Sequence, residues 1–309
     1  MKGDGLRMTG PTGPHESVLT YAEPSWSLED LVEAKAGRRV SAVLPALNEE
    51  GTIAQVIASL AWLRGTLLDD VLVVDGGSTD RTPELAKEAG ARVVTTAEAL
   101  PGVPLVGGKG EALWRSLAVV DSDFVVFIDT DLIDPDPTFT SKLLGPLLTN
   151  GSTHLVKGYY RRPLGSADPS GGGRVTELVA RPMLAALRPG LRTLLQPLAG
   201  EYAARTATLR ALEFAPGYGV EIGMVLDVYD RFGAAGLAQV NLGARAHRNQ
   251  PLSELAAMSR QIIHTMLTRS GVPDSQAPLL LAQSGQAGLE FAERQLRREG
   301  HPPMDEAQR

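Results

Sequence analysis

The chain has 309 residues, 43% of them hydrophobic, which is enough for one large domain or for one domain with an extension. Its 30 lysines and arginines against 36 aspartates and glutamates give a net charge of −6, so the composition does not indicate a surface for nucleic acid or anionic membranes. The absence of cysteine excludes disulfides, zinc–thiolate sites and thiol catalysis. No apolar run approaches the roughly 20 residues that span a bilayer. We therefore expect a soluble protein of the cytoplasm, without membrane insertion.

The first half of the chain shows a regular alternation of strand-like and helix-like patterns. Residues 1–26 are rich in glycine, proline and threonine and are expected to form a flexible arm. A short capped helix is predicted to begin near Ser27. Strands are then predicted over 40–44, 71–75, 92–95 and 124–128, with helices beginning near 53, 82 and 111. This alternation predicts an α/β fold, with a mostly parallel twisted sheet and helices on both faces. Ligands of such sheets bind beyond the carboxyl ends of the strands.

The second half is less regular. Strands are predicted over 154–160 and 238–242, and helices over 171–187, 221–231 and 251–270. Beyond Pro273 the pattern weakens, and the charged residues from Arg294 onward are expected to form a mobile tail.

The central stretch runs from Phe124 to Asp131, where a strand that is apolar on both faces ends in two carboxylates. Residues i and i+2 of a strand point the same way, so Asp129 and Asp131 can face one ligand. Burying two unpaired carboxylates costs free energy, and a divalent cation bound between them would offset their negative charges. Proteins usually hold Mg²⁺ or Mn²⁺ with one or two carboxylates and substrate phosphates. The pattern indicates a metal and diphosphate site. The alternative is that Asp131 or Asp134 caps the following helix.

Two turns between a strand and a helix, 48–50 and 75–80, carry short polar side chains and glycines. Such turns leave backbone N–H groups available to an anionic ligand. Ordinary helix capping by Asn48, Ser78 and Thr79 is the alternative. Two such turns beside the Asp-x-Asp strand favour a nucleotide site.

Two glycine-rich segments could meet an anion. Residues 107–110 precede a helix and can place Lys109 on a phosphate, but no serine or threonine follows this lysine as a Walker A loop requires. The G-x-G-x-x-G dinucleotide pattern is also absent. Residues 171–173 precede Arg174 and Thr176, which suits an anion cradle. A flexible loop before an ordinary helix is the alternative there.

Three further polar residues have two interpretations each. His247 follows a predicted strand and could join Asp131 on a metal, which would allow Mn²⁺ as well as Mg²⁺, or it could be an ordinary surface or core histidine. Glu221 lies in a glycine-flanked approach to a helix and could accept hydrogen bonds from a polyhydroxyl substrate or complement the helix dipole. Lys157 is interpreted as solvated charge rather than as an acceptor contact.

From about Ser27 to about Pro273 the sequence resembles the actinobacterial glucosyl-3-phosphoglycerate synthases. The segments that carry the resemblance are 45–50, 75–80, 108–116, 129–131, 171–181, 196–202, 214–223 and 241–249. The resemblance implies a GT-A type fold with a helical C-terminal extension, and a glycosyltransferase that retains anomeric configuration. Glucose would pass from UDP-glucose to the 2-hydroxyl of 3-phosphoglycerate with a divalent metal, Mg²⁺ or Mn²⁺. The route would lead to methylglucose lipopolysaccharides or glucosylglycerate.

The resemblance also assigns roles to residues. Those expected to hold the nucleotide-sugar are Pro45, Ala46, Leu47, Asn48, Glu49, Ser78, Lys109, Asp129 and Thr130. Those expected to bind the acceptor are Gly173, Arg174 and Thr176. The expected metal ligands are Asp131 and His247. Those expected to act in catalysis are Asp131, Lys109, Glu221 at the glucose hydroxyls and Arg245 beside the diphosphate. Thr130 and Gly76 each replace a more familiar serine, and neither change removes a proposed ligand.

The implied organisation divides the chain into an arm (1–26), a nucleotide-sugar-binding half (27–165), an acceptor-binding half with dimerisation helices (166–273) and a C-terminal tail (274–309). A homodimer is expected. The alternatives are a mannosyl-3-phosphoglycerate synthase that uses GDP-mannose, a nucleotidyltransferase that releases pyrophosphate, and a non-catalytic nucleotide-sugar-binding protein.

Overall fold

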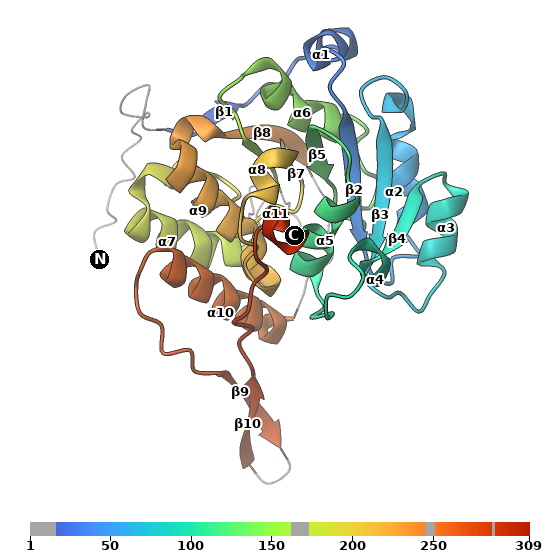
Figure 1. Cartoon of the computed structure of the whole chain (residues 1–309). Coiled ribbons are helices and arrows are strands. Elements are labelled where there is room, and N and C mark those ends of the chain that lie inside the picture. The colour runs from blue at the N-terminus through green and yellow to red at the C-terminus, as the bar shows by residue number, and fades with distance from the viewer. Residues whose placement is uncertain (1–16, 162–172, 245–250, 286–287) are drawn as a thin grey trace.

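A computed structural model describes residues 17–161, 173–244, 251–285 and 288–309. Within these ranges an eight-stranded sheet forms the centre of the molecule (Figure 1). Its strands are β1 (Leu19–Tyr21), β2 (Val40–Ala46), β3 (Asp70–Asp75), β4 (Arg92–Thr95), β5 (Phe124–Phe127), β6 (Leu155–Arg161), β7 (Tyr202–Arg205) and β8 (Leu237–Ala244). Their order across the sheet is β1-β8-β6-β7-β5-β2-β3-β4.

The sheet is mostly parallel, as predicted. Strands β2, β3, β4 and β5 pair in parallel, as do β6, β8 and β1. Strand β7 lies between β5 and β6 and runs antiparallel to both. The sequence analysis did not predict β7 or the mixed centre that it creates.

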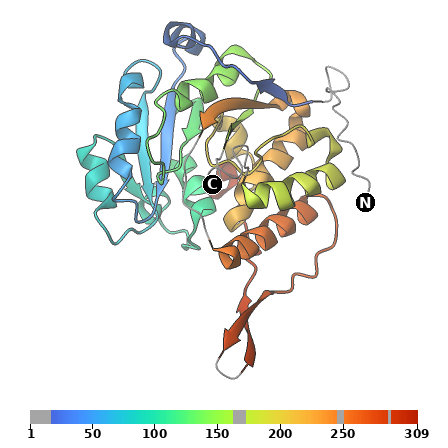
Figure 2. The same ribbon diagram turned by 180° about the vertical axis from the view of Figure 1, so that it is seen from behind.

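Helices cover both faces of the sheet (Figures 1 and 2). One apolar core lies under α1 (Leu28–Lys35), α2 (Ile53–Ser59), α3 (Thr82–Glu88) and α6 (Phe139–Thr149). The other lies under α5 (Lys109–Val119), α7 (Arg181–Leu187), α8 (Thr206–Arg210), α9 (Val220–Phe232), α10 (Leu252–Arg269) and α11 (Met304–Ala307). Shorter helical segments are α4 (Thr96–Ala99), η1 (Ala61–Leu63), the π turn η2 (Thr176–Ala180), η3 (Pro189–Leu191), η4 (Gly217–Gly219) and η5 (Ala234–Gly236). No helix in the described part of the chain combines the length and apolarity that a membrane crossing needs.

The predicted helix over 171–187 is interrupted by the π turn η2. Its widened hydrogen bond runs from the N–H of Arg181 to the carbonyl of Thr176. Pro182 follows directly, at the start of α7. Proline has no N–H to give to the carbonyl four residues earlier, and its ring clashes with that carbonyl, so a local widening relieves both problems.

The prediction of a flexible arm over residues 1–26 is wrong from Leu19 onward. Strand β1 pairs with β8, with Leu19 opposite Ala238, so the chain already joins the sheet at this point. The rings of Tyr21 and Trp26 then lie 4.9 Å apart. Three residues are too few for periodicity to reveal a strand, and β1 depends on the edge that β8 offers.

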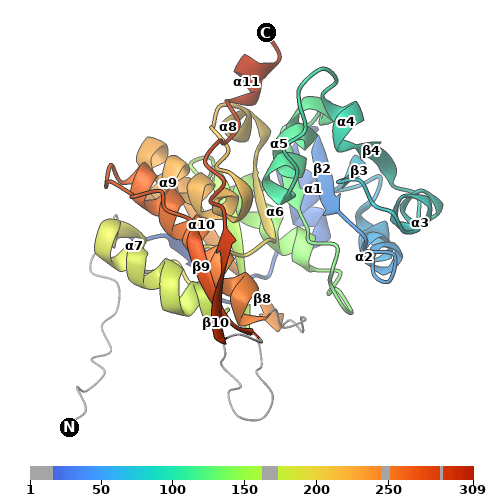
Figure 3. The ribbon, with the colours of Figure 1, turned by 90° about the horizontal axis from the view of Figure 1, so that it is seen from below.

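The expected mobile tail is also wrong. Strands β9 (Leu279–Gly285) and β10 (Gly288–Arg294) form a hairpin that projects from the body (Figures 1 and 2) and lies in front of it when the molecule is seen from below (Figure 3). The C-terminal segment then returns to the body, where Trp114 Nε1 donates a hydrogen bond to the Pro302 carbonyl at 2.8 Å and Met304 is fully buried. Helix α11 packs against α5 and α8. We call residues 295–302 the C-terminal strap.

Candidate active site

Three of the predicted donor-binding segments meet at one edge of the sheet, because β2, β3 and β5 are parallel and end there. Thr130 Oγ1, after β5, donates to the Pro45 carbonyl at the end of β2 at 2.9 Å. The backbone N–H of Asn48 donates to Ser78 Oγ at 2.9 Å, and that of Thr79 donates to Asn48 Oδ1 at 2.9 Å. These bonds fix the turns 45–50 and 75–80 relative to one another.

The capping alternative for these turns is wrong. The N-cap residue of α2 is Thr52 and that of α3 is Arg81, and neither makes a side-chain capping bond. Asn48 instead adopts a left-handed conformation with φ 56°, which asparagine tolerates better than most residues. The polar side chains therefore shape the turns and do not cap the helices.

The capping alternative for the Asp-x-Asp segment is wrong as well. Helix α6 begins at Phe139 with Thr138 as its N-cap, well beyond Asp131 and Asp134. The side chain of Asp131 is exposed, and Asp129 is partly buried. Both lie at the edge of the sheet where parallel strands offer a ligand site.

Lys109 joins three elements of the site. Its Nζ lies 2.6 Å from Asp129 Oδ1, after β5, and 3.1 Å from Glu221 Oε1, in the first turn of α9. Gly108, with φ 101°, provides the turn that places Lys109 at the start of α5. Burial lowers the pKa of the Lys109 ammonium, but the Asp129 and Glu221 carboxylates outweigh it, and the pKa is raised well above 10.5. Lys109 is thus a fixed positive charge at neutral pH.

Lys157 is buried in the same site, so its interpretation as solvated charge is wrong. Only 1% of its surface is exposed. Its Nζ donates to the Ala199 carbonyl at 2.5 Å and lies 4.5 Å from the centre of the Tyr202 ring. Burial and the nearby Lys109 lower its pKa to about 8, against the opposing effect of Glu221. The signal in the sequence was a single lysine inside an otherwise apolar strand.

Replacing Lys157 by methionine should reveal this pKa in the stability of the protein. The folded chain binds the Lys157 proton only below about pH 8, and the unfolded chain keeps it up to about pH 10.5. Because the unfolded chain binds more protons between these values, wild-type stability gains from rising pH in this window. Relative to Lys157→Met, the wild-type free energy of unfolding should rise by about 2 kcal/mol between pH 8 and about pH 9.5, measured by denaturant unfolding. Lys142→Met on α6 is the control. A difference that does not vary with pH would contradict the prediction.

The segment directly before β7, which contains Gly200 and Glu201 and which we call the entrance to β7, packs tightly against Asp129. A Cβ added at Gly200 would lie 2.1 Å from Asp129 Oδ2, so any other residue here must displace the Asp129 carboxylate or the segment itself. The N–H of Gly158 on β6 donates to the Glu201 carbonyl at 2.9 Å and holds this entrance in place. Sequence reasoning had placed this segment only within the resemblance, and the contact requires the unpredicted antiparallel strand.

The predicted acceptor residues lie at the start of the helical segment that continues into η2 and α7. Arg174 is exposed in its first turn, Gly173 is partly buried, and Thr176 is 6% exposed. Arg245 and His247 lie outside the described residues, as do Gly171 and Gly172.

The metal prediction has one ligand within the described residues. An exposed Asp131 carboxylate is the kind of oxygen ligand that Mg²⁺ and Mn²⁺ take, so it fits the predicted metal. Among the described residues, no group of three or more histidine, aspartate or glutamate side chains gathers around a common point. The predicted partner His247 is outside them.

Comparison with known proteins identifies the family. The family model "Glycosyl transferase family 2" matches residues 41–169. The glucosyl-3-phosphoglycerate synthase of Petrotoga mobilis is 41% identical over 251 residues, which cover 79% of this chain and 77% of that protein. The enzyme of the same name from Mycolicibacterium smegmatis is 60% identical over 259 residues, which cover 83% of this chain and 86% of that protein. This chain belongs to the glucosyl-3-phosphoglycerate synthase family.

Solved structures agree with membership in this synthase family. A crystal structure of glucosyl-3-phosphoglycerate synthase from Mycobacterium tuberculosis, in complex with Mn²⁺, UDP and glucosyl-3-phosphoglycerate, matches with a TM-score of 0.86 and 53% identity. The match covers 93% of this chain and 99% of that one. Another structure of the synthase from that organism contains Mg²⁺ and UDP. The predicted family, the α/β fold and the glycosyltransferase class are thereby confirmed.

Proposed function

We propose that this chain transfers glucose from UDP-glucose to the 2-hydroxyl of 3-phosphoglycerate, releasing UDP and retaining the anomeric configuration, with a divalent metal. The observation that carries the proposal is the similarity to a Mycobacterium tuberculosis synthase solved with Mn²⁺, UDP-glucose and phosphoglyceric acid, at 53% identity over 93% of this chain. The joined turns at the sheet edge and the Lys109 cluster support it from this chain's own residues.

The donor would lie over these turns. The turn from Pro45 to Glu49, together with Ser78, would hold uridine and ribose, and Asp129 would face the ribose or the sugar. Thr130 would support this donor site by holding the Pro45 carbonyl. Glu221, 7% exposed at the head of α9, would accept hydrogen bonds from glucose hydroxyls. As the bond from glucose C1 to the diphosphate breaks, negative charge develops on UDP. Lys109, held protonated by its two carboxylates, would stabilise that charge, with Arg245 beside it.

The metal would be held by Asp131 and His247. A bound Mg²⁺ or Mn²⁺ supplies Lewis-acid stabilisation of the diphosphate. A new bond forms between glucose C1 and the acceptor oxygen, and the acceptor hydroxyl gives its proton to the departing phosphate. The exposed side chain of Arg174, with Gly173 and Thr176, would seat the phosphoglycerate.

Arg174→Ala should separate acceptor binding from donor binding. Hydrogen bonds to a charged group contribute about 1.5–3 kcal/mol, so the KM for 3-phosphoglycerate should rise about tenfold or more. The KM for UDP-glucose should change much less. Initial rates with each substrate varied in turn give both constants. Arg181→Ala removes an arginine seven residues further along, which pairs with Glu177, and is the matched control. Equal effects on both KM values would show that Arg174 is not an acceptor contact.

The expected homodimer belongs to this proposal. Leu280, Leu289 and Phe291 lie on one face of the β9–β10 hairpin, because their strand register places them on the same side. Their exposed fractions are 53%, 67% and 60%. A second copy of the chain would cover this apolar face in addition to the predicted dimerisation helices within 166–273. Light scattering of the wild type and of Phe291→Asp tests it: a wild-type monomer would contradict the proposal. The cytoplasmic location stays a prediction.

The experiment that tests the function is a product assay. Purified protein is incubated with UDP-glucose or GDP-mannose, with 3-phosphoglycerate, and with Mg²⁺ or EDTA. Formation of glucosyl-phosphoglycerate that depends on the metal is the expected result. Product from GDP-mannose alone would instead make the chain a mannosyltransferase, pyrophosphate release would indicate a nucleotidyltransferase, and UDP binding without product would leave a binding protein.

A further inference from the structure

The turn that carries Lys109 contains two consecutive glycines in left-handed conformations. Gly107 has φ 78° and Gly108 has φ 101°. Glycine gives a turn its shape but leaves the backbone unusually free, so external contacts must hold it. On its inner side, Glu111 Oε2 accepts hydrogen bonds from the N–H groups of Val106, at 2.8 Å, and of Gly107.

The outer side of this turn is held by Arg297 from the C-terminal strap, 188 residues further along the chain from Lys109. Arg297 Nη1 donates to the Gly107 carbonyl. An added Cβ at Gly108 would lie 2.7 Å from the same nitrogen, so the guanidinium lies directly on the turn. Its contact with the backbone carbonyl does not depend on any side chain of the turn.

The aliphatic part of the Arg297 side chain lies beside η4, the turn that precedes Glu221. A Cβ added at Gly217 in η4 would lie 3.6 Å from Arg297 Cδ. Helix α9 follows η4 directly and carries Glu221, the second carboxylate on Lys109. One arginine therefore contacts the turn before Lys109 and lies beside the turn before Glu221.

The backbone of Arg297 is itself fixed by a buried side chain. Gln261 on α10, 6% exposed, donates from Nε2 to the Arg297 carbonyl at 2.9 Å and accepts from the Arg297 N–H at 3.2 Å. A glutamine that satisfies both backbone groups of one residue fixes its position along the strap. Gln261 thus fixes the position of Arg297 relative to α10.

We infer that Arg297, held by Gln261, is a positioning residue. It keeps the turn before Lys109 and the turn before Glu221 in the relative positions that binding of the nucleotide diphosphate needs. It acts on the reaction through these turns. The inference deepens the proposed function and rests on it for its kinetic consequence, while its effect on UDP affinity can be measured without turnover. An error of about 1 Å in the placement of a catalytic group can cost about a hundredfold in rate, so loss of this contact should be visible.

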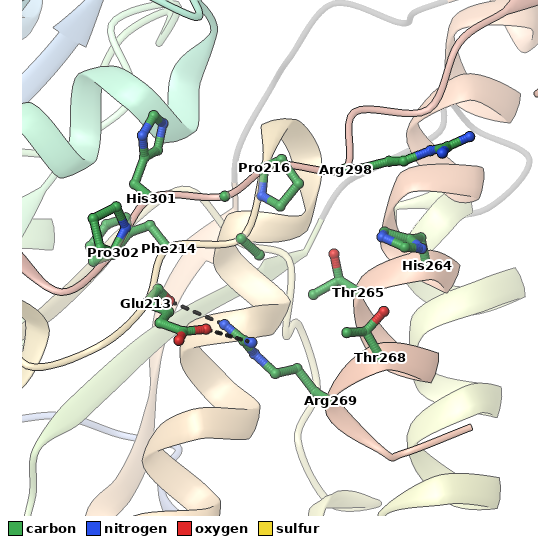
Figure 4. A pocket seen from close by; sticks show the side chains of 12 residues that line it. Glu213, Phe214, Pro216, His264, Thr265, Thr268, Arg269, Arg298, His301 and Pro302 are labelled. Atoms are coloured by element: carbon green, nitrogen blue, oxygen red, sulfur yellow. Dashed lines mark hydrogen bonds and ion pairs between the residues drawn. The ribbon is translucent and has the colours of Figure 1, made fainter. Parts of the chain in front are cut away.

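The adjacent residue supplies a matched control. Arg298 is also on the strap, but its Nη2 donates to the Gln276 carbonyl at 3.1 Å, away from the Lys109 turn. It lines a pocket of about 350 Å³ between the strap, α10 and residues 213–216 (Figure 4). In this view Arg298 extends along the α10 side near His264. Substituting Arg297 or Arg298 removes the same chemical group from the same segment.

The test compares Arg297→Ala, Arg297→Lys, Gln261→Ala and Arg298→Ala in the full-length chain. Calorimetry with UDP and Mn²⁺ should give an affinity at least about fivefold weaker for Arg297→Ala and Gln261→Ala, and unchanged for Arg298→Ala. Arg297→Lys, which keeps the charge and one donor direction, should recover part of the affinity. In the product assay kcat should fall about tenfold for Arg297→Ala, with the KM for 3-phosphoglycerate unchanged. The double variant Arg297→Ala/Gln261→Ala should be no worse than Arg297→Ala alone, because the two residues act as one unit.

Equal effects of Arg297→Ala and Arg298→Ala on UDP affinity would overturn the inference, since they would indicate a general loosening of the strap. Wild-type UDP affinity in Arg297→Ala would overturn it directly. If the wild-type chain forms no product but UDP affinity still falls in Arg297→Ala alone, the positioning role stands and the proposed reaction fails.

Discussion

Asp131→Ala is expected to lower turnover about a thousandfold or more while the chain still folds. Under the proposed function, Asp131 is a ligand of the metal that neutralises the departing diphosphate. Lewis-acid stabilisation is worth several kcal/mol, and about 4 kcal/mol corresponds to about a thousandfold in rate. The Asp131 side chain is exposed beyond the end of β5, so alanine opens no cavity in the core. The measurement is kcat at saturating UDP-glucose, 3-phosphoglycerate and Mn²⁺, with thermal unfolding as the check on folding.

The control is Asp121→Ala, which removes another exposed carboxylate, one that pairs with Arg39 at 2.7 Å. Asp121 precedes β5, at the end of the strand opposite to Asp131, and its substitution should leave turnover unchanged. Adding EDTA to the wild type should reproduce the Asp131→Ala loss, and adding it to Asp131→Ala should have little further effect. Turnover of Asp131→Ala near the wild-type level would contradict the assignment of Asp131 to the metal.

The parallel part of the fold was predictable because its signals are local. Strands buried on both faces give apolar runs, and the predicted strand 92–95 coincides with β4. Helix α1 has the expected capping box, in which Ser27 and Asp30 satisfy one another's backbone N–H groups. The edge of the sheet where ligands bind then follows from strand direction alone.

The features that sequence reasoning missed depend on contacts between distant segments. Strand β7 is only Tyr202–Arg205, and its neighbours β5 and β6 determine its conformation more than its own residues do. The burial of Lys157 follows from β7, because the Ala199 carbonyl that accepts its hydrogen bond lies just before that strand. The strap has few apolar residues and is held by separate contacts such as the Trp114–His301 stack, with ring centres 4.4 Å apart. None of these leaves a periodic pattern in the sequence.

Gly200→Ala is expected to lower kcat/KM by about a hundredfold or more, although it adds a single methyl group. That methyl carbon would lie 2.1 Å from Asp129 Oδ2 and 2.5 Å from Asp129 Cγ, far inside van der Waals contact. Either the Asp129 carboxylate leaves Lys109, from which it is 2.6 Å away, or the entrance to β7 moves outward. Both changes displace donor-site groups on the scale of about 1 Å that costs about a hundredfold in rate. Overpacking should also lower stability by about 1–3 kcal/mol.

Gly151→Ala separates this effect from the general cost of replacing a glycine. A Cβ at Gly151, before β6, meets no atom within 4 Å, and its φ is not in the left-handed region, so rate and stability should stay near the wild-type values. The decisive comparison is between activity and stability in Gly200→Ala at a temperature where it is fully folded. Because Asp129 would face the donor, UDP affinity should fall together with kcat/KM. Wild-type kinetics in a folded Gly200→Ala protein would mean that Asp129 can turn away without loss, and that its contact with Lys109 is not needed to place the donor.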